Sequence, residues 1–261
     1  TERGRFLAKT YRSDVKVLDS LQFQHRLSDH LHENGLPVAR IQRARDGRSL
    51  IEIEDWALEL QQYVDASSMV INKDSLKSSA DALGRFHCVG VGFPTPPRDT
   101  RMWRFSEVPR ESFQRLYRRA REEGDPDRID KYCNEIALFL QSATQALSIE
   151  KRSEFQTGLI HGDWHGGNLL YRGPELAAII DLEFAGDGCY LEDLAYAISN
   201  LCIRSTTEPE LLAVRTNLLL DYYQVNRKLS YAELFALYYA VGIKHVATVS
   251  YQTRQLPPGG L

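Results

Sequence analysis

The chain has 261 residues, of which 43% are hydrophobic and 26% are charged. This apolar content, together with a net charge of only -3, excludes a chain that is mainly disordered. Nucleic acid is disfavoured as an electrostatically bound partner, because 32 Lys and Arg residues stand against 35 Asp and Glu residues. The longest apolar run, residues 232–249, is interrupted by charged side chains and predicts a buried helix rather than a membrane span. The four cysteines form no CxxC pair, so we expect reduced thiols in a cytoplasmic protein.

The first sixty residues predict a small unit of mixed strands and helix. Residues 5–11 alternate in polarity and predict a short strand. Residues 14–34 repeat apolar positions at steps of three and four and predict an amphipathic helix, for which Gly35 is a plausible stop. Residues 49–53 and 56–62 alternate again and predict a β-hairpin.

Beyond this unit the pattern is mostly helical. Helices are predicted over residues 74–89, 129–149, 191–203, 208–226 and 230–253. One strand pair interrupts them, with strands at residues 169–171 and 177–180. The Arg-rich segment 98–128 also contains many acidic residues and predicts a solvated helix face. The whole chain is therefore predicted to have an α+β fold with two domains, residues 1–64 and residues 65–261.

The segment most informative about chemistry is the Gly-rich stretch 159–170, which lies between two apolar runs. The predicted strand pair brings Asn168 and Asp181 to the same open end, and Asp163 lies in the loop that leads into it. An amide oxygen and a carboxylate are ligands suited to Mg²⁺, which keeps waters and takes further ligands from substrate phosphates. A third carboxylate nearby can accept the proton of a hydroxyl group. The pattern therefore predicts phosphoryl transfer, with Asp163 as the catalytic residue.

These motifs resemble the catalytic and metal loops of the aminoglycoside phosphotransferase family, which includes choline and homoserine kinases. The resemblance rests on His161-Gly162-Asp163, on Asn168 five residues later, on Ile180-Asp181 and on Asp193 in a Glu-Asp-Leu-Ala run. It implies a bilobal protein-kinase-like fold with a small N-terminal lobe and a larger, mainly helical C-terminal lobe. The glycine-rich phosphate loop of such kinases is not visible before the first strand, and we expect it in a segment preceding Thr1.

The resemblance also implies a nucleotide site. Lys9 occupies the position of the lysine that contacts the α- and β-phosphates, and its helix partner, usually glutamate, corresponds here to Gln24. Gln62 and Val64 lie in the connector whose backbone reads the adenine edge. The implied cofactors are ATP, or alternatively GTP, and Mg²⁺.

Further residues near the motifs are expected to support the loop or to line an acceptor pocket. His161 is interpreted as a structural histidine, and Asp193 as a residue that tethers the loop through backbone hydrogen bonds. Trp164 and His165 are candidates for the pocket wall. Glu183 is either a second metal ligand or the partner of a cation.

The favoured function is thus an ATP-dependent kinase that phosphorylates a hydroxyl of a small molecule, such as an aminoglycoside-like antibiotic, an amino alcohol or a sugar. One alternative is a kinase-like protein of weak activity that binds nucleotide in a regulatory role, to which Gln24 and the unseen phosphate loop point. A remote alternative is a metallohydrolase that uses the string His161, Asp163 and His165. The sequence leaves the acceptor and the oligomeric state open.

Overall fold

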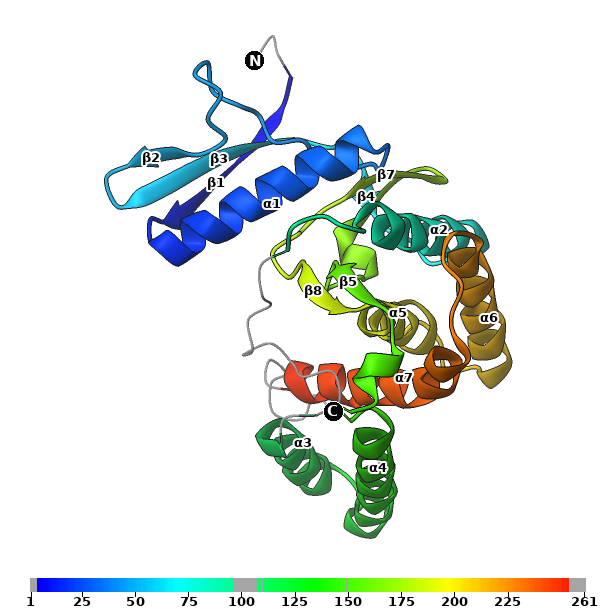
Figure 1. Cartoon of the computed structure of the whole chain (residues 1–261). Helices are drawn as coiled ribbons and strands as arrows, with labels where there is room; N and C mark the ends of the chain where they lie inside the picture. The colour runs from blue at the N-terminus through cyan, green and yellow to red at the C-terminus, as the bar shows by residue number, and fades with distance from the viewer. Residues whose placement is uncertain (1–3, 96–107, 109, 149, 254–261) are drawn as a thin grey trace.

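The computed structural model describes residues 4–95, 108, 110–148 and 150–253. Its N-terminal part is a three-stranded antiparallel sheet in the order β1-β3-β2, with helix α1 lying along it (Figure 1). The elements are β1 (Phe6–Arg12), α1 (Val15–Glu33), β2 (Ile51–Ile53) and β3 (Trp56–Gln62). The predicted strand, helix and hairpin are all confirmed.

Helix α1 begins and ends as its sequence dictates. The Asp14 side chain accepts a hydrogen bond from the Val17 N–H, which satisfies one of the free donors of the first turn. Its buried face includes Leu27 and Leu31, one helical turn apart. Gly35, with φ of 78°, follows the helix in the left-handed conformation that a residue with a Cβ rarely adopts.

The C-terminal part is mainly helical, as predicted. Its helices are α2 (Lys73–Val89), α3 (Arg110–Glu123), α4 (Pro126–Ala146), α5 (Tyr190–Ala197), α6 (Pro209–Asn226) and α7 (Tyr231–Gln252), with short 3-10 turns η1 (Arg152–Glu154) and η2 (Gly166–Asn168) and a π-helix η3 (Ile198–Ile203) that continues α5. Among the described residues, none of the helices is long and apolar enough to cross a membrane.

Two small sheets, rather than one strand pair, interrupt these helices. The predicted pair, β6 (Leu169–Arg172) and β7 (Glu175–Ile179), is extended by β4 (Ser67–Ser68) in the order β4-β6-β7. A second pair joins β5 (Thr157–Ile160) to β8 (Gly186–Cys189) and was not predicted. The sequence of β8, Gly-Asp-Gly-Cys, has low strand propensity, and its pairing depends on the tertiary contact with β5.

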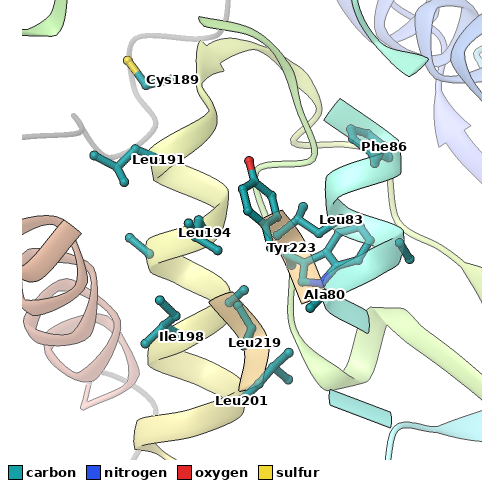
Figure 2. Close-up of a cluster of buried hydrophobic side chains, with 14 of the residues drawn as sticks. Ala80, Leu83, Phe86, Cys189, Leu191, Leu194, Ile198, Leu201, Leu219 and Tyr223 are labelled. Carbon is teal, nitrogen blue, oxygen red and sulfur yellow. The ribbon is translucent and has the colours of Figure 1, made fainter. Parts of the chain in front are cut away.

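The main hydrophobic core lies among α2, α5, η3 and α6. Figure 2 labels core side chains from these elements, together with Cys189 of β8: Ala80, Leu83, Phe86, Cys189, Leu191, Leu194, Ile198, Leu201, Leu219 and Tyr223. Helices α2 and α6 lie side by side, and Gly84 permits this approach because a Cβ there would meet the Tyr223 carbonyl oxygen at 2.8 Å. This core holds α5 and β5, the strand that leads into the Gly-rich loop.

Several contacts attach the N-terminal part to the rest of the molecule, among them the bonds of His30 with the Val89 carbonyl and of Arg85 with the Gly35 carbonyl. Two others involve the connector and the end of β7. The chain crosses at residues 63–66, directly after β3. Separately, the Ile179 N–H at the end of β7 donates to the Pro37 carbonyl at 2.8 Å, and Val38 forms a parallel bridge with Ile179. This second attachment lies next to the predicted metal residue Asp181.

Candidate active site

The loop that follows β5 is held by a buried carboxylate from α5. The backbone N–H groups of His161 and Gly162 donate to the two carboxylate oxygens of Asp193 at 2.6 and 2.7 Å. Gly162 has φ of 83°, and a Cβ at this position would lie 2.4 Å from the Phe184 carbonyl oxygen, so only glycine fits. Asp193 therefore has the tethering geometry that was expected of it.

Asp163 projects from this loop and accepts hydrogen bonds from three side chains. The Asn168 Nδ2 donates to its Oδ2 at 2.9 Å, and the His165 Nε2 lies 3.2 Å from the same oxygen. The Tyr196 hydroxyl also bonds to the carboxylate. Burial raises the pKa of Asp163, but the hydrogen bonds from His165 and Tyr196 outweigh burial and leave the pKa below its usual value. The carboxylate is therefore ionised and held in one orientation.

The strand pair β6–β7 brings Asn168 and Asp181 together, as the sequence predicts. Asn168 directly precedes β6, Leu169 pairs with Ile179, and the Ile180 N–H donates to the Asn168 carbonyl at 3.0 Å. The Asn168 amide nitrogen donates both to the Asp163 carbonyl and to its carboxylate. These two bonds orient the amide group, and its oxygen is left to act as a ligand.

Asp181 has φ of 64°, in the left-handed region that Asp and Asn tolerate better than other residues with a Cβ. Asp181 and Glu183 are both exposed, whereas Leu182 between them is buried. Burial raises the pKa of Glu183, and the negative charges of Asp181 and Asp163 raise it further. Such mutual repulsion means that a cation bound here would be stabilised.

The donor set fits Mg²⁺ better than a metal held by protein ligands alone. Within the described residues, no group of three or more His, Cys, Asp or Glu side chains is arranged to hold a metal ion. One amide oxygen and one or two carboxylates correspond to a site that completes its shell with water and substrate phosphates.

A narrow cleft runs between the N-terminal sheet and the end of β7. Lys9 and Gln24 line this cleft from β1 and α1, and Asp181 and Glu183 line it from the opposite side. Lys9 lies close enough to lower the pKa of Glu183, against the larger upward effects. The structure thus places Lys9, Gln24, Asp181 and Glu183 around one cavity.

The connector residues are arranged differently from the other candidates. The Gln62 side chain lines a separate cavity with Arg5 and Arg40, and it is Gln61 that faces the cleft. The Gln62 N–H donates to the Arg40 carbonyl at 2.8 Å. In the described part of the chain, the Val64 N–H donates to no acceptor.

The expectation that Trp164 lines the acceptor pocket is wrong. Its side chain is fully buried, and its Nε1–H donates to the Ser79 hydroxyl of α2 at 3.0 Å. Trp164 packs edge-on against Phe86 and His161 and is a core residue of the loop. His165 remains partly exposed beside Asp163, and its Nδ1 accepts from the Gly167 N–H.

His161 has the structural role that was expected. It is completely buried, its Nδ1 accepts from the Asp163 N–H, and its Nε2 donates to the Ile180 carbonyl. Because both ring nitrogens are engaged with backbone groups, His161 is not available as a metal ligand. The geometry therefore gives no support to a metallohydrolase centre at His161, Asp163 and His165.

Two residues of this site were missed in the sequence. Tyr196 follows Asp193 by three positions, so both lie on the face of α5 that turns toward the loop, and this helical spacing could have revealed Tyr196. His87 of α2 is buried and places its Nε2 3.1 Å from the Asp193 carboxylate. No local pattern pairs α2 with α5, so His87 could not have been found in this way.

The cleft, the oriented carboxylate and the paired strand ends define a phosphotransferase of protein-kinase-like fold. The chain belongs to the phosphotransferase enzyme family, whose sequence profile matches residues 1–227. It is 25% identical to the homoserine kinase of Caulobacter vibrioides over 244 residues, which cover 91% of this chain and 71% of that kinase. The predicted class of enzyme, an ATP-dependent kinase of small molecules, is thereby confirmed.

Solved structures confirm the predicted fold. An amicoumacin kinase in complex with AMP-PNP and Ca²⁺ superposes with a TM-score of 0.70 at 15% identity, covering 98% of this chain and 76% of that one. An aminoglycoside phosphotransferase from Alicyclobacillus acidocaldarius gives a TM-score of 0.70 at 15% identity, covering 98% and 79%. At 15% identity, these two structures support a shared fold and carry no conclusion about a shared substrate.

Proposed function

We propose that the protein transfers the γ-phosphoryl group of a magnesium-bound nucleoside triphosphate to a hydroxyl group of a small molecule. The observation that carries this proposal is that Asn168 joins Asp163 to the end of the hairpin, where Asp181 lines a cleft that Lys9 lines from the other side. Phosphoryl transfer requires mainly positioning and charge neutralisation, and this arrangement offers both.

The residues take distinct parts in this reaction. Asn168 and Asp181 would hold Mg²⁺, which when bound neutralises charge on the phosphates. Asp163 accepts a hydrogen bond from the acceptor hydroxyl, orients its oxygen toward the γ-phosphorus and takes its proton as the new P–O bond forms. The bond from the γ-phosphorus to the bridging oxygen of the β-phosphate breaks in the same step, and the nucleoside diphosphate leaves. The hydrogen bonds from His165 and Tyr196 hold the Asp163 carboxylate in place.

Nucleotide binding is assigned to residues 1–64, and catalysis together with acceptor binding to residues 65–261. Lys9 is suited to contact the non-transferred phosphates, and the N–H of Val64 and the carbonyl of Gln62 are suited to the edge of the base, with ATP preferred over GTP as the donor. We place the reaction in the cytoplasm, where both the nucleotide and Mg²⁺ are abundant. In support, no cysteine in the described part of the chain forms a disulfide.

The acceptor is proposed to be a hydroxyl compound that carries an ammonium group. Asp163 and Glu183 add two carboxylates beside the proposed metal ligand Asp181, and the negative charge of Asp163 and Asp181 raises the pKa of Glu183, so a cation is favoured here. The related homoserine kinase is named for an amino acid with a hydroxyl group, which belongs to the same chemical class. Amino alcohols and aminoglycosides belong to it as well, and uncharged sugars do not.

The test is a screen of ATP consumption against homoserine, amino alcohols, aminoglycosides and uncharged sugars, with ATP and GTP and with and without Mg²⁺. Thermal unfolding with AMP-PNP provides a separate measure of nucleotide binding, since a ligand at 100 times its Kd adds about 2.7 kcal/mol of stability. Nucleotide-dependent stabilisation and turnover with an ammonium-bearing acceptor support the proposal. Stabilisation without turnover on any acceptor would indicate a regulatory nucleotide-binding protein instead.

A further inference from the structure

The cleft contains a lysine whose usual helical partner is replaced by a neutral residue. In protein kinases the corresponding lysine is held by an ion pair with a glutamate of the adjacent helix. Here α1 presents Gln24 to the cleft, and its side-chain amide donates to the Ser20 hydroxyl of its own helix. An amide can bond to an ammonium group but adds no negative charge to it.

A carboxylate lies instead on the neighbouring strand, directly opposite the lysine. In the antiparallel pairing of β1 with β3, Lys9 faces Glu59. Residues opposite each other in such a pair project from the same face of the sheet, with Cβ atoms about 4.5–5.5 Å apart. Lys9 is the only Lys or Arg among the described residues that line the cleft. Glu59 therefore lies opposite Lys9 on the same face of the sheet, and no ion pair shorter than 4.0 Å joins these two described side chains, since Glu59 is bonded to His25 and Tyr11.

The Glu59 side chain is buried and rigidly held. It is 3% exposed, and it accepts hydrogen bonds from His25 Nε2 at 2.6 Å and from the Tyr11 hydroxyl at 3.2 Å. The other nitrogen of His25 is bonded to the Ser49 hydroxyl at 2.8 Å. Burying a carboxylate is unfavourable unless it is bonded and paired. If the position were purely structural, an apolar residue of similar size would give the same or greater stability.

The residues that bond to Glu59 come from β1, which carries Lys9, and from α1, which carries Gln24. His25 follows Gln24 on α1, and Tyr11 lies two residues beyond Lys9 on the same face of β1. Helix α1 thus supplies no carboxylate at this position. It contacts the Glu59 carboxylate, which belongs to the sheet, through the hydrogen bond from His25.

We propose that Glu59 is the positioning residue for Lys9 and that His25 fixes Glu59 in place, so that the countercharge of the nucleotide-binding lysine lies on β3 rather than on α1. Glu183, on the opposite wall, lies among the carboxylates of the metal end and is better placed to interact with a cation there. The inference deepens the proposed function and depends on it, since Lys9 needs an oriented ammonium group only if it binds phosphates.

The test is Glu59→Gln, which keeps the shape of the side chain and its acceptor oxygen but removes the charge. We expect kcat/KM for ATP to fall at least about tenfold, the scale of one charge-assisted hydrogen bond, with the KM for the acceptor unchanged. Glu52→Gln, an exposed carboxylate on β2 of the same sheet, is the matched control and should be neutral. In a Lys9→Met background, Glu59→Gln should have no further effect, because the two residues act as one unit.

Rescue separates positioning from a merely structural role. Gln24→Glu returns a carboxylate to α1 and should restore most of the activity that Glu59→Gln loses. Full activity of Glu59→Gln, an equal loss in the Lys9→Met background, or absence of rescue would each overturn the inference. If Glu59→Gln does not fold, Glu59→Asp, which keeps the charge and withdraws it by one methylene, enters the same comparison. Failure of the wild type to bind AMP-PNP would instead refute the proposed function on which the inference rests.

Discussion

Asp163 shows how a single carboxylate is prepared for proton transfer by its neighbours. Asn168, His165 and Tyr196 all donate to it, from the turn η2, from the loop and from α5. Three donors lower the proton affinity of the group, so its contribution is chiefly to orient the acceptor and to accept a proton late in the reaction. The same donors prevent rotation of the carboxylate away from the acceptor.

Asp163→Asn is expected to reduce kcat by about 10²-fold or more, because an amide cannot take the proton, while nucleotide affinity stays nearly unchanged. Steady-state turnover with the best acceptor from the screen and AMP-PNP binding measure the two effects. Asp187→Asn changes an exposed carboxylate on β8 and is the control. A turnover of Asp163→Asn within a few fold of wild type would exclude Asp163 as the proton acceptor.

Asp181 has a left-handed backbone conformation and a negative charge, and a substitution can remove the charge while keeping the conformation. Asn tolerates the left-handed conformation of residue 181, so Asp181→Asn should keep the fold and lose only the charge. We expect turnover to fall steeply and the Mg²⁺ concentration for half-maximal rate to rise, because one hard ligand is lost. The measurement is a Mg²⁺ titration of the rate, with thermal unfolding as a check of the fold. An unchanged Mg²⁺ dependence would rule out Asp181 as a ligand.

Among the individual site residues, the sequence predicted those that lie close to one another along the chain. Asp163 and Asn168 lie five positions apart in one loop, and a hairpin of ordinary length brings Asp181 to them. His87 and Glu59 belong to other elements, and only tertiary packing brings His87 to Asp193 and Glu59 opposite Lys9. Trp164 was misjudged because an aromatic residue beside a catalytic aspartate can face either the pocket or the core, and the adjacent α2 offered it a hydroxyl partner.

Among the elements, α5 and α2 support the loop through a chain of buried hydrogen bonds. Asp193 receives the two backbone N–H groups and the His87 ring, and the other nitrogen of His87 lies 2.8 Å from the Tyr223 hydroxyl. Arg227 donates to the same hydroxyl and to Glu233. Three helices therefore determine where the loop after β5 lies.

Asp193→Asn should test this support. It places an amide N–H against a backbone N–H, and we expect a loss of about 3–5 kcal/mol in the free energy of unfolding. Urea unfolding at pH 7.5 measures this loss, and Asp221→Asn, at an exposed position of α6, provides the comparison. Equal stability of the two variants would show that the hydrogen bonds of Asp193 contribute little to the free energy of unfolding.

The helices α2, α4 and α7 were predictable because each has an apolar stripe and a capping residue of its own. Asn72 caps α2, Asp125 caps α4 and Ser230 caps α7, each by a side-chain bond to a backbone N–H of the first turn. The strands β5 and β8 lack such local signals, since each contains glycine and the whole β6–β7 hairpin separates them along the chain. The two-residue strand β4 is likewise defined by its partner β6 rather than by its own sequence.

For the whole molecule, the buried histidines make stability depend on pH in a defined window. Burial lowers the pKa of His87 and of His161 in the folded protein. In the unfolded chain both titrate near about pH 6.5. As the pH falls below that value, the unfolded state takes up protons that the folded state does not. The stabilisation is therefore fully present above about pH 6.5 and is lost progressively below it.

We expect the free energy of unfolding to fall by up to about 2.7 kcal/mol per pH unit below that point, for two protons. Urea unfolding at pH 7.5 and 5.5 measures it, above the range in which the carboxylates titrate. His87→Gln removes one of the two groups and should flatten the dependence, whereas His32→Gln, at an exposed position of α1, should not. A wild type equally stable at both pH values would contradict the assignment.

The contacts between the N-terminal part and the rest of the molecule limit how the cleft can open. They gather near the C-terminal end of α1 and at the crossing of residues 63–66: the Pro37 carbonyl bonds to the Ile179 N–H, the Gly35 carbonyl to Arg85, and the His30 ring to the Val89 carbonyl. Asp181 lies two residues from Ile179, so bending of the N-terminal part about these contacts would move it little. The turn of the sheet at residues 54–55 lies at the opposite end and would move most (Figure 1). Opening of the cleft would thus admit and release nucleotide while the metal end of the hairpin keeps its place.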